Sequence, residues 1–165
     1  EIDRFTAPPA ILRDLAFVPA LSGLGCPHWD RSAAGLWIGL GLDTTRSDMM
    51  QSMLEGIALR AAEVIAAMKH LVPLGTRISV DGGMARNPYV LSFLATALDK
   101  TVLVPSSVNL TALGTARMAM IGAGAPELPT LPPPAHFIAP TGGFGAEASS
   151  RFAEAVTRAR AWRRS

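Results

Sequence analysis

The sequence predicts an α/β domain in which helices pack on a largely parallel sheet. One observation is that short strand-like apolar runs alternate with segments whose apolar residues recur at helical spacing. The strand-like runs occupy residues 35–40, 78–81 and 101–104, and the periodic segments occupy residues 45–71, 88–98, 110–121 and 146–162. A second observation is the composition: 165 residues, 49% hydrophobic and 17% charged, are enough for one domain with a real core.

Charge and cysteine content narrow the class of protein. The net charge of +2 is too small to argue for a nucleic-acid partner. A single cysteine, Cys26, excludes an internal disulfide framework and fits a reducing cytoplasm. No apolar run reaches membrane-spanning length, and no signal peptide opens the chain. We therefore expect a cytoplasmic protein, and the opening Glu1 suggests a piece of a longer one.

Residues 1–34 combine short apolar runs with prolines and glycines, which is typical of loops. His28, Trp29 and Asp30 are adjacent there and could suggest a site. A single histidine beside a tryptophan more often serves packing and hydrogen bonding, so we favour a structural role. A strand is expected at residues 35–40.

The longest periodic segment, residues 45–71, predicts a long amphipathic helix. Thr45 and Asp48 form a capping box, and Pro73 with Gly75 ends the helix. The expected apolar face consists of Met50, Leu54, Ile57, Ala61, Val64, Ile65 and Met68. Glu55 and Glu63 are then expected on the solvated side.

The stretch at residues 77–98 organises the rest of the chain. An apolar run reaches Asp81, the pair Gly82-Gly83 follows, and Asn87-Pro88 gives a strong helix start. Adjacent glycines at the carboxyl end of a strand remove side chains that would hold a ligand away. A nucleotide base or ribose could lie against them, with the Asn87 amide in hydrogen-bonding reach. A plain turn between strand and helix is the alternative, and the residues alone leave both open.

After a short strand at residues 101–104, residues 110–121 predict a helix with small side chains, in which Gly114 calls for close backbone packing. We divide the chain into a domain at residues 1–124, a Pro/Gly-rich connector at residues 125–145 and a docked terminal helix at residues 146–165. Phe137 and Ile138 are expected to pack against the domain and so to hold the connector on it. The terminal helix should bury Phe152, Ala155, Val156, Ala159 and Trp162.

Three motifs in order, FVPALSGLGCPHWDRSAAG, VDGGMARN and TALGTA, resemble the C-terminal part of the FGGY family of carbohydrate kinases. That family has two ribonuclease-H-like domains and belongs to the actin and sugar-kinase superfamily. The resemblance implies an incomplete ATPase domain of this fold, with a mixed sheet flanked by helices. Within the family, the Trp29-Asp30 pair, the VDGG turn and the tail AVTRARAW are most similar to the glycerol kinases.

The resemblance implies phosphoryl transfer from ATP, with Mg²⁺, to a polyol, foremost glycerol giving glycerol 3-phosphate. Gly82 and Gly83 would lie against the nucleotide, and Asn87 would bond near the adenine. The family's catalytic aspartate and phosphate-contacting motifs lie upstream, so no catalytic residue and no metal ligand is assigned here. We expect the chain to be inactive without its missing N-terminal domain.

Several alternatives stay open. A pentulose kinase of the same family, acting on xylulose or ribulose, is one of them. A non-catalytic module that binds nucleotide or a partner protein is another, since fold alone does not fix function. The Gly-rich connector and the segment before the last helix depart from the glycerol kinase pattern, which keeps the exact substrate open. A homodimer also stays open.

Overall fold

The computed structural model describes residues 4–69, 71–106, 109–125, 130 and 133–164. Its elements, in chain order, are η1 (Ala10–Arg13), β1 (Ala16–Val18), β2 (Leu36–Ile38), α1 (Arg46–Met68), β3 (Arg77–Ser79), η2 (Gly83–Arg86), α2 (Pro88–Leu98), β4 (Thr101–Pro105), α3 (Leu110–Gly122), β5 (Pro134–Ile138) and α4 (Gly145–Ala159). Strands β1 and β2 pair antiparallel, while β3, β4 and β5 form a second sheet. Because β4 pairs parallel with β3 and antiparallel with β5, that sheet is mixed.

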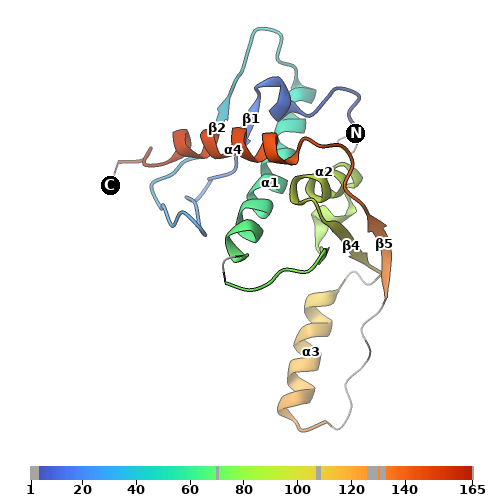
Figure 1. Cartoon of the computed structure of the whole chain (residues 1–165). Coiled ribbons are helices and arrows are strands. Elements are labelled where there is room, and N and C mark those ends of the chain that lie inside the picture. The colour runs from blue at the N-terminus through green and yellow to red at the C-terminus, as the bar shows by residue number, and fades with distance from the viewer. Residues whose placement is uncertain (1–3, 70, 107–108, 126–129, 131–132, 165) are drawn as a thin grey trace.

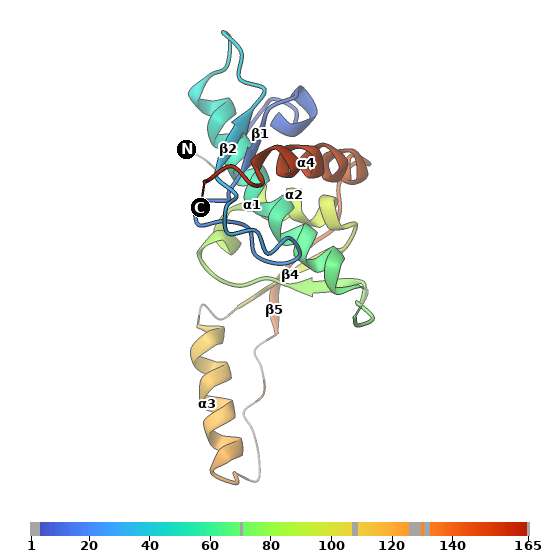
Figure 2. The same ribbon diagram turned by 90° about the vertical axis from the view of Figure 1, so that its left-hand side faces the viewer.

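The core lies where α1, α2 and α4 meet around β1 (Figure 1). All three residues of β1 are buried, although the sequence reads as loop there. Helix α4 lies across β1, and α1 packs on both β1 and α2 (Figures 1 and 2). Large side chains of this core include Ile11, Val18, Leu54, Leu59, Val90, Leu91, Phe93, Leu94, Val102, Phe152 and Val156. Segments far apart in the sequence therefore build one apolar centre.

Helix α1 begins as predicted, with a capping box between Thr45 and Asp48. Its buried face differs from the predicted one, because it consists of Gln51, Ser52, Leu54, Glu55, Gly56, Ala58, Leu59 and Ala62. Gly56 permits this orientation: a Cβ there would lie 2.1 Å from the carbonyl oxygen of Phe17 in β1. The expectation that Glu55 is solvated is wrong, since it is 1% exposed.

Strand β5 falls inside the segment expected to be a connector. It pairs with β4 through Val102 and Ile138, and Ile138 packs against the core. Phe137, one residue earlier, is 60% exposed, so only one of the two predicted anchors packs on the core, and that one is partly buried. Alternate residues of a strand point to opposite faces, which accounts for the difference.

Helix α3 extends away from the body of the molecule (Figures 1 and 2). The structure describes all of its residues, and none of them is buried. No heavy atom of the described residues lies within 4 Å of a Cβ built on Gly114. The expected close packing at this glycine is therefore absent from the described structure.

Helix α4 buries Phe152, Ala155, Val156 and Ala159, as the periodicity predicts. It ends at Ala159, so Trp162 lies beyond the helix and is 74% exposed, which corrects the predicted face. Within the described parts of the chain, no helix is both long and apolar enough to cross a membrane.

Candidate functional site

The diglycine turn follows β3 at its carboxyl end, after Val80 and Asp81. Gly82 has φ 103° and ψ −178°, a conformation that glycine adopts readily and other residues resist. Gly83 opens η2, whose turn is closed by bonds from the Ala85 amide to the Gly82 oxygen and from the Asn87 amide to the Met84 oxygen. Both glycines are exposed, and a Cβ on either would meet no heavy atom of the described residues within 4 Å. A flat ligand can therefore approach bare main chain here.

Asn87 joins this turn to α2. Its side-chain oxygen accepts a hydrogen bond from the Val90 amide at 3.1 Å, which is an N-cap, and Pro88 follows at the first helical position. The predicted helix start is confirmed. The side-chain oxygen of Asn87 therefore serves the cap, and the amide nitrogen at the other end of the side chain is a hydrogen-bond donor.

The sheet order places the turn where open α/β sheets bind ligands. Strands β3 and β4 run parallel, and the ladder extends past β3 because the Val80 amide donates to the Leu103 oxygen at 2.9 Å. Ligands of such sheets lie outside the carboxyl ends of the parallel strands. Ala85, inside the turn, is 8% exposed and anchors it to the core.

A buried polar network holds the start of α2 against α1 and the N-terminal segment. Glu55 accepts hydrogen bonds from the amides of Ala10 (2.8 Å) and Ile11 (2.9 Å) and from the Tyr89 hydroxyl (2.5 Å). Gln51 adds bonds to the Tyr89 hydroxyl (2.8 Å) and the Pro8 oxygen (3.1 Å). The sequence alone did not predict this network.

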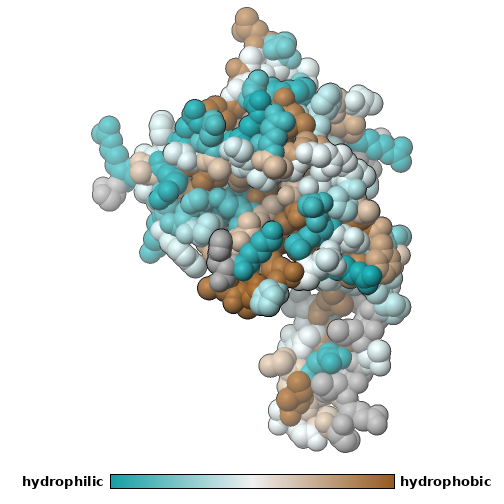
Figure 3. Space-filling view, viewed as in Figure 1, coloured by the Kyte–Doolittle hydropathy of each residue, from teal (hydrophilic) through white to brown (hydrophobic). Residues whose placement is uncertain are grey.

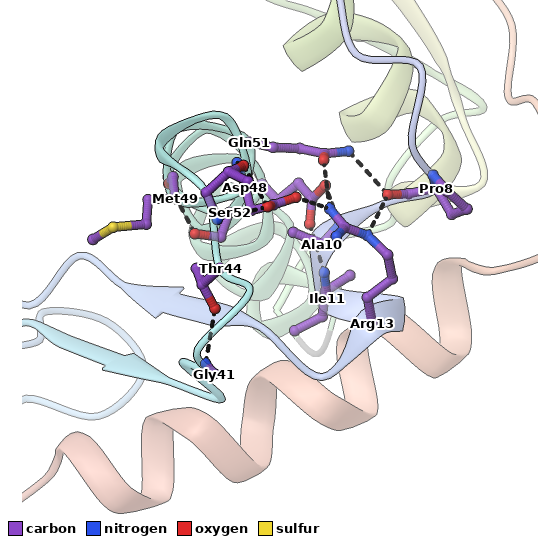
Figure 4. Close-up of polar contacts among 12 residues, drawn as sticks. Pro8, Ala10, Ile11, Arg13, Gly41, Thr44, Asp48, Met49, Gln51 and Ser52 are labelled. Atoms are coloured by element: carbon purple, nitrogen blue, oxygen red, sulfur yellow. Dashed lines mark hydrogen bonds and ion pairs between the residues drawn. The ribbon is translucent and has the colours of Figure 1, made fainter.

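Arg13 continues the same network toward solvent (Figure 4). It donates to the Gln51 oxygen at 2.9 Å and pairs with Asp48 at 2.8 Å. Burial raises the pKa of Glu55, and burial beside Glu55 also raises the pKa of the Tyr89 hydroxyl. Hydrogen bonds from Thr45 and then Arg13 lower the pKa of Asp48 to about 2. The network therefore fixes the first turn of α2, the helix that follows the diglycine turn.

His28, Trp29 and Asp30 do not form a site together. One Asp30 oxygen accepts from the Ser32 amide (2.9 Å) and hydroxyl (2.6 Å), and the other accepts from the Ala161 amide (2.9 Å). His28 contacts Glu63 at 2.5 Å, and Trp29 is 77% exposed. The polar side chains therefore serve the fold.

The described residues gather no group of three His, Cys, Asp or Glu side chains that could hold a metal ion.

Glu63, which was expected to be solvated, is instead about 20% exposed and pairs with both His28 and Arg60. Arg60 also donates to the Cys26 oxygen at 3.0 Å. This cluster ties the loop after β1 to α1.

Comparison with known proteins gives several matches. Residues 5–123 match the model of the FGGY family of carbohydrate kinases, C-terminal domain. The chain is 45% identical to the glycerol kinase of Thermus brockianus over 117 residues, which are 70% of this chain and 24% of that protein. It is 38% identical to the glycerol kinase of Bordetella parapertussis over 126 residues, 75% of this chain and 25% of that protein.

Solved structures share the fold. A crystal structure of a xyloylose kinase from Brucella ovis has a TM-score of 0.73 at 29% identity, covering 94% of this chain and 31% of that one. The glycerol kinase of Plasmodium falciparum with ADP has a TM-score of 0.73 at 22% identity, covering 91% and 32%. The chain thus spans about a quarter of the length of the curated relatives it matches.

Proposed function

Because the chain belongs to the FGGY family of carbohydrate kinases, we propose that it forms the nucleotide-binding part of an ATP-dependent kinase that phosphorylates a polyol. The proposed acceptor is glycerol, whose hydroxyl oxygen takes the γ-phosphoryl group of ATP to give glycerol 3-phosphate and ADP. The glycerol kinase names of relatives at 38–45% identity support this substrate.

The observation that carries the nucleotide site is the open diglycine turn. Gly82 and Gly83 expose main chain at the carboxyl end of a parallel strand, and no described neighbour fills the space that side chains would occupy. We propose that the adenosine lies against these glycines, with the Asn87 amide nitrogen donating to it. The Glu55–Tyr89 bond supports the turn indirectly, because it fixes the helix that Asn87 caps.

Such a reaction needs more than a floor for adenosine. Phosphoryl transfer requires in-line positioning, neutralisation of phosphate charge and a base for the attacking hydroxyl. We propose that the base and the phosphate-binding groups belong to polypeptide outside these 165 residues, so that this chain alone binds without turnover. Mg²⁺, which the family implies, would neutralise phosphate charge and would arrive with the nucleotide.

A pentulose kinase is the second candidate. The likeness to the Brucella ovis enzyme favours it, since 94% of this chain aligns at 29% identity. Rates for the complete protein with glycerol, xylulose and ribulose separate the two candidates. A protein that binds ATP but phosphorylates none of the three would instead favour the non-catalytic module.

The nucleotide site is tested by calorimetric titration of ATP into the complete protein. Gly83→Val is the sharpest change, because Gly83 has no positive φ and a side chain there meets open space in the described structure. We expect at least a tenfold loss of ATP affinity with little loss of stability. Gly143→Val is the matched control, since that glycine is equally open and lies in the loop before α4. Equal ATP affinity in wild type and Gly83→Val would overturn the site.

A further inference from the structure

A hollow of about 190 Å³ opens between α1, α2 and α4, away from the diglycine turn. Residues of the hydrophobic core form its floor: Leu59 and Phe152 line it, and each is 2% exposed. Much of the remaining wall consists of short side chains, among them Ala62, Ala97 and Ala153. The hollow exists because three helices meet where these residues are too small to fill the gap.

Apolar surface lies at the end of α1, next in sequence to the lining residue Lys69. Figure 3 shows hydrophobic surface at the lower edge of the body, over the end of α1, with hydrophilic surface beside it. The exposed hydrophobic residues at the end of α1 and just after it are Met68 (43%), Leu71 (83%) and Val72 (46%). Contiguous exposed apolar surface commonly marks a binding site.

Two cations line the same hollow. Lys100 Nζ donates to the Gly75 oxygen at 2.5 Å, and an ammonium group has three donors, so it can also bind an anion. Lys69 forms no ion pair within the described parts of the chain. The one acidic residue of the lining, Glu63, pairs with His28 and Arg60. The lining therefore presents uncompensated positive charge beside an apolar floor.

We propose that this hollow binds a small carboxylate with an unbranched apolar tail. The tail would lie over Leu59 and Phe152, and the carboxylate would meet the ammonium groups of Lys69 and Lys100. A methylene group is similar in size to a water molecule, which takes up about 30 Å³, so the volume holds roughly six carbons. The site is separate from the proposed nucleotide site, and its failure would leave that proposal untouched.

The direct test is calorimetric titration of the complete protein with straight-chain carboxylates from butanoate to decanoate. Each added methylene should tighten binding about fourfold until the hollow is full near heptanoate or octanoate, after which the gain should stop. Octan-1-ol, the uncharged match to octanoate, should bind more weakly. No saturable binding, no dependence on tail length, or equal binding of octanol and octanoate would each overturn the proposal.

Substitutions locate the site. Lys69→Met combined with Lys100→Met should weaken octanoate binding about fivefold to tenfold. Arg46→Met, which removes a cation from the far end of α1, should leave it unchanged. Ala153→Phe should plug the hollow and abolish binding, whereas Thr157→Phe, one turn further along α4, should not. Octanoate affinity that is unchanged in both the lysine double variant and Ala153→Phe would place binding elsewhere and refute the assignment.

Discussion

The contact between α1 and β1 at Gly56 predicts that the smallest possible enlargement there, Gly56→Ala, destabilises the protein. A Cβ at this position would lie 2.1 Å from the Phe17 carbonyl oxygen and 3.1 Å from its carbonyl carbon. Phe17 cannot yield freely, because β1 is fully buried and pairs with β2 opposite Trp37. The helix would have to move about 1 Å from the strand to restore an ordinary contact.

Two effects of opposite sign set the size of this change. Replacing a mid-helix glycine by alanine stabilises a helix by about 1 kcal/mol when the site is open. Overpacking a well-filled core costs about 1–3 kcal/mol, and a clash with backbone belongs at the upper end. We therefore expect a net loss of about 2 kcal/mol in the free energy of unfolding. For a chain of this size, that corresponds to a melting temperature lower by about 5 °C.

Urea unfolding followed by circular dichroism measures this loss, with Gly114→Ala as the matched control. Gly114 is also a mid-helix glycine, but a Cβ there meets no described neighbour. Gly114→Ala should raise helix content and should not lower the urea midpoint. If Gly56→Ala behaved like Gly114→Ala, the close approach of α1 to β1 would be wrong.

The remaining predictions concern the polar groups around α2. Glu55→Gln replaces one accepting oxygen by an amide donor, which then faces one or two of the three donors to Glu55, so it should cost about 1–3 kcal/mol in urea unfolding, and Tyr89→Phe should cost less. Because the pKa of Asp48 is lowered to about 2, the unfolded chain binds more protons at low pH, and stability should fall between pH 4 and 2. Asp48→Asn should flatten that fall in an acid titration of the melting temperature. Asn87→Ala should lose about 1 kcal/mol with the cap, whereas Asn87→Asp should keep the cap and still bind ATP less tightly in calorimetry.

Local signals in the sequence predicted the helices well. The Thr45–Asp48 capping box and the Asn87-Pro88 start both appear as expected, because caps depend on neighbouring residues only. The fold class and the mixed sheet follow the family resemblance. The position of the diglycine turn after a strand is confirmed, while its role as a nucleotide floor stays a prediction.

Features set by distant contacts could not be predicted in this way. The buried face of α1 was wrong because Glu55 is stabilised by amides some 45 residues away, and no local pattern reveals those donors. The three residues of β1 are all buried and the first four residues of β5 are all exposed, so neither strand gives an alternating signal. Gly114 in α3 predicted close backbone packing, and no described neighbour packs against it.

The packing of α4 on β1 has a consequence for synthesis of the chain. About 130 residues separate Ala16 from Gly145, and ribosomes add roughly 5–20 residues per second. The ribosome therefore completes β1 on the order of ten seconds before it completes α4, and β1 lacks its covering helix during that time. During that interval its apolar side chains are open to chaperones and to neighbouring chains.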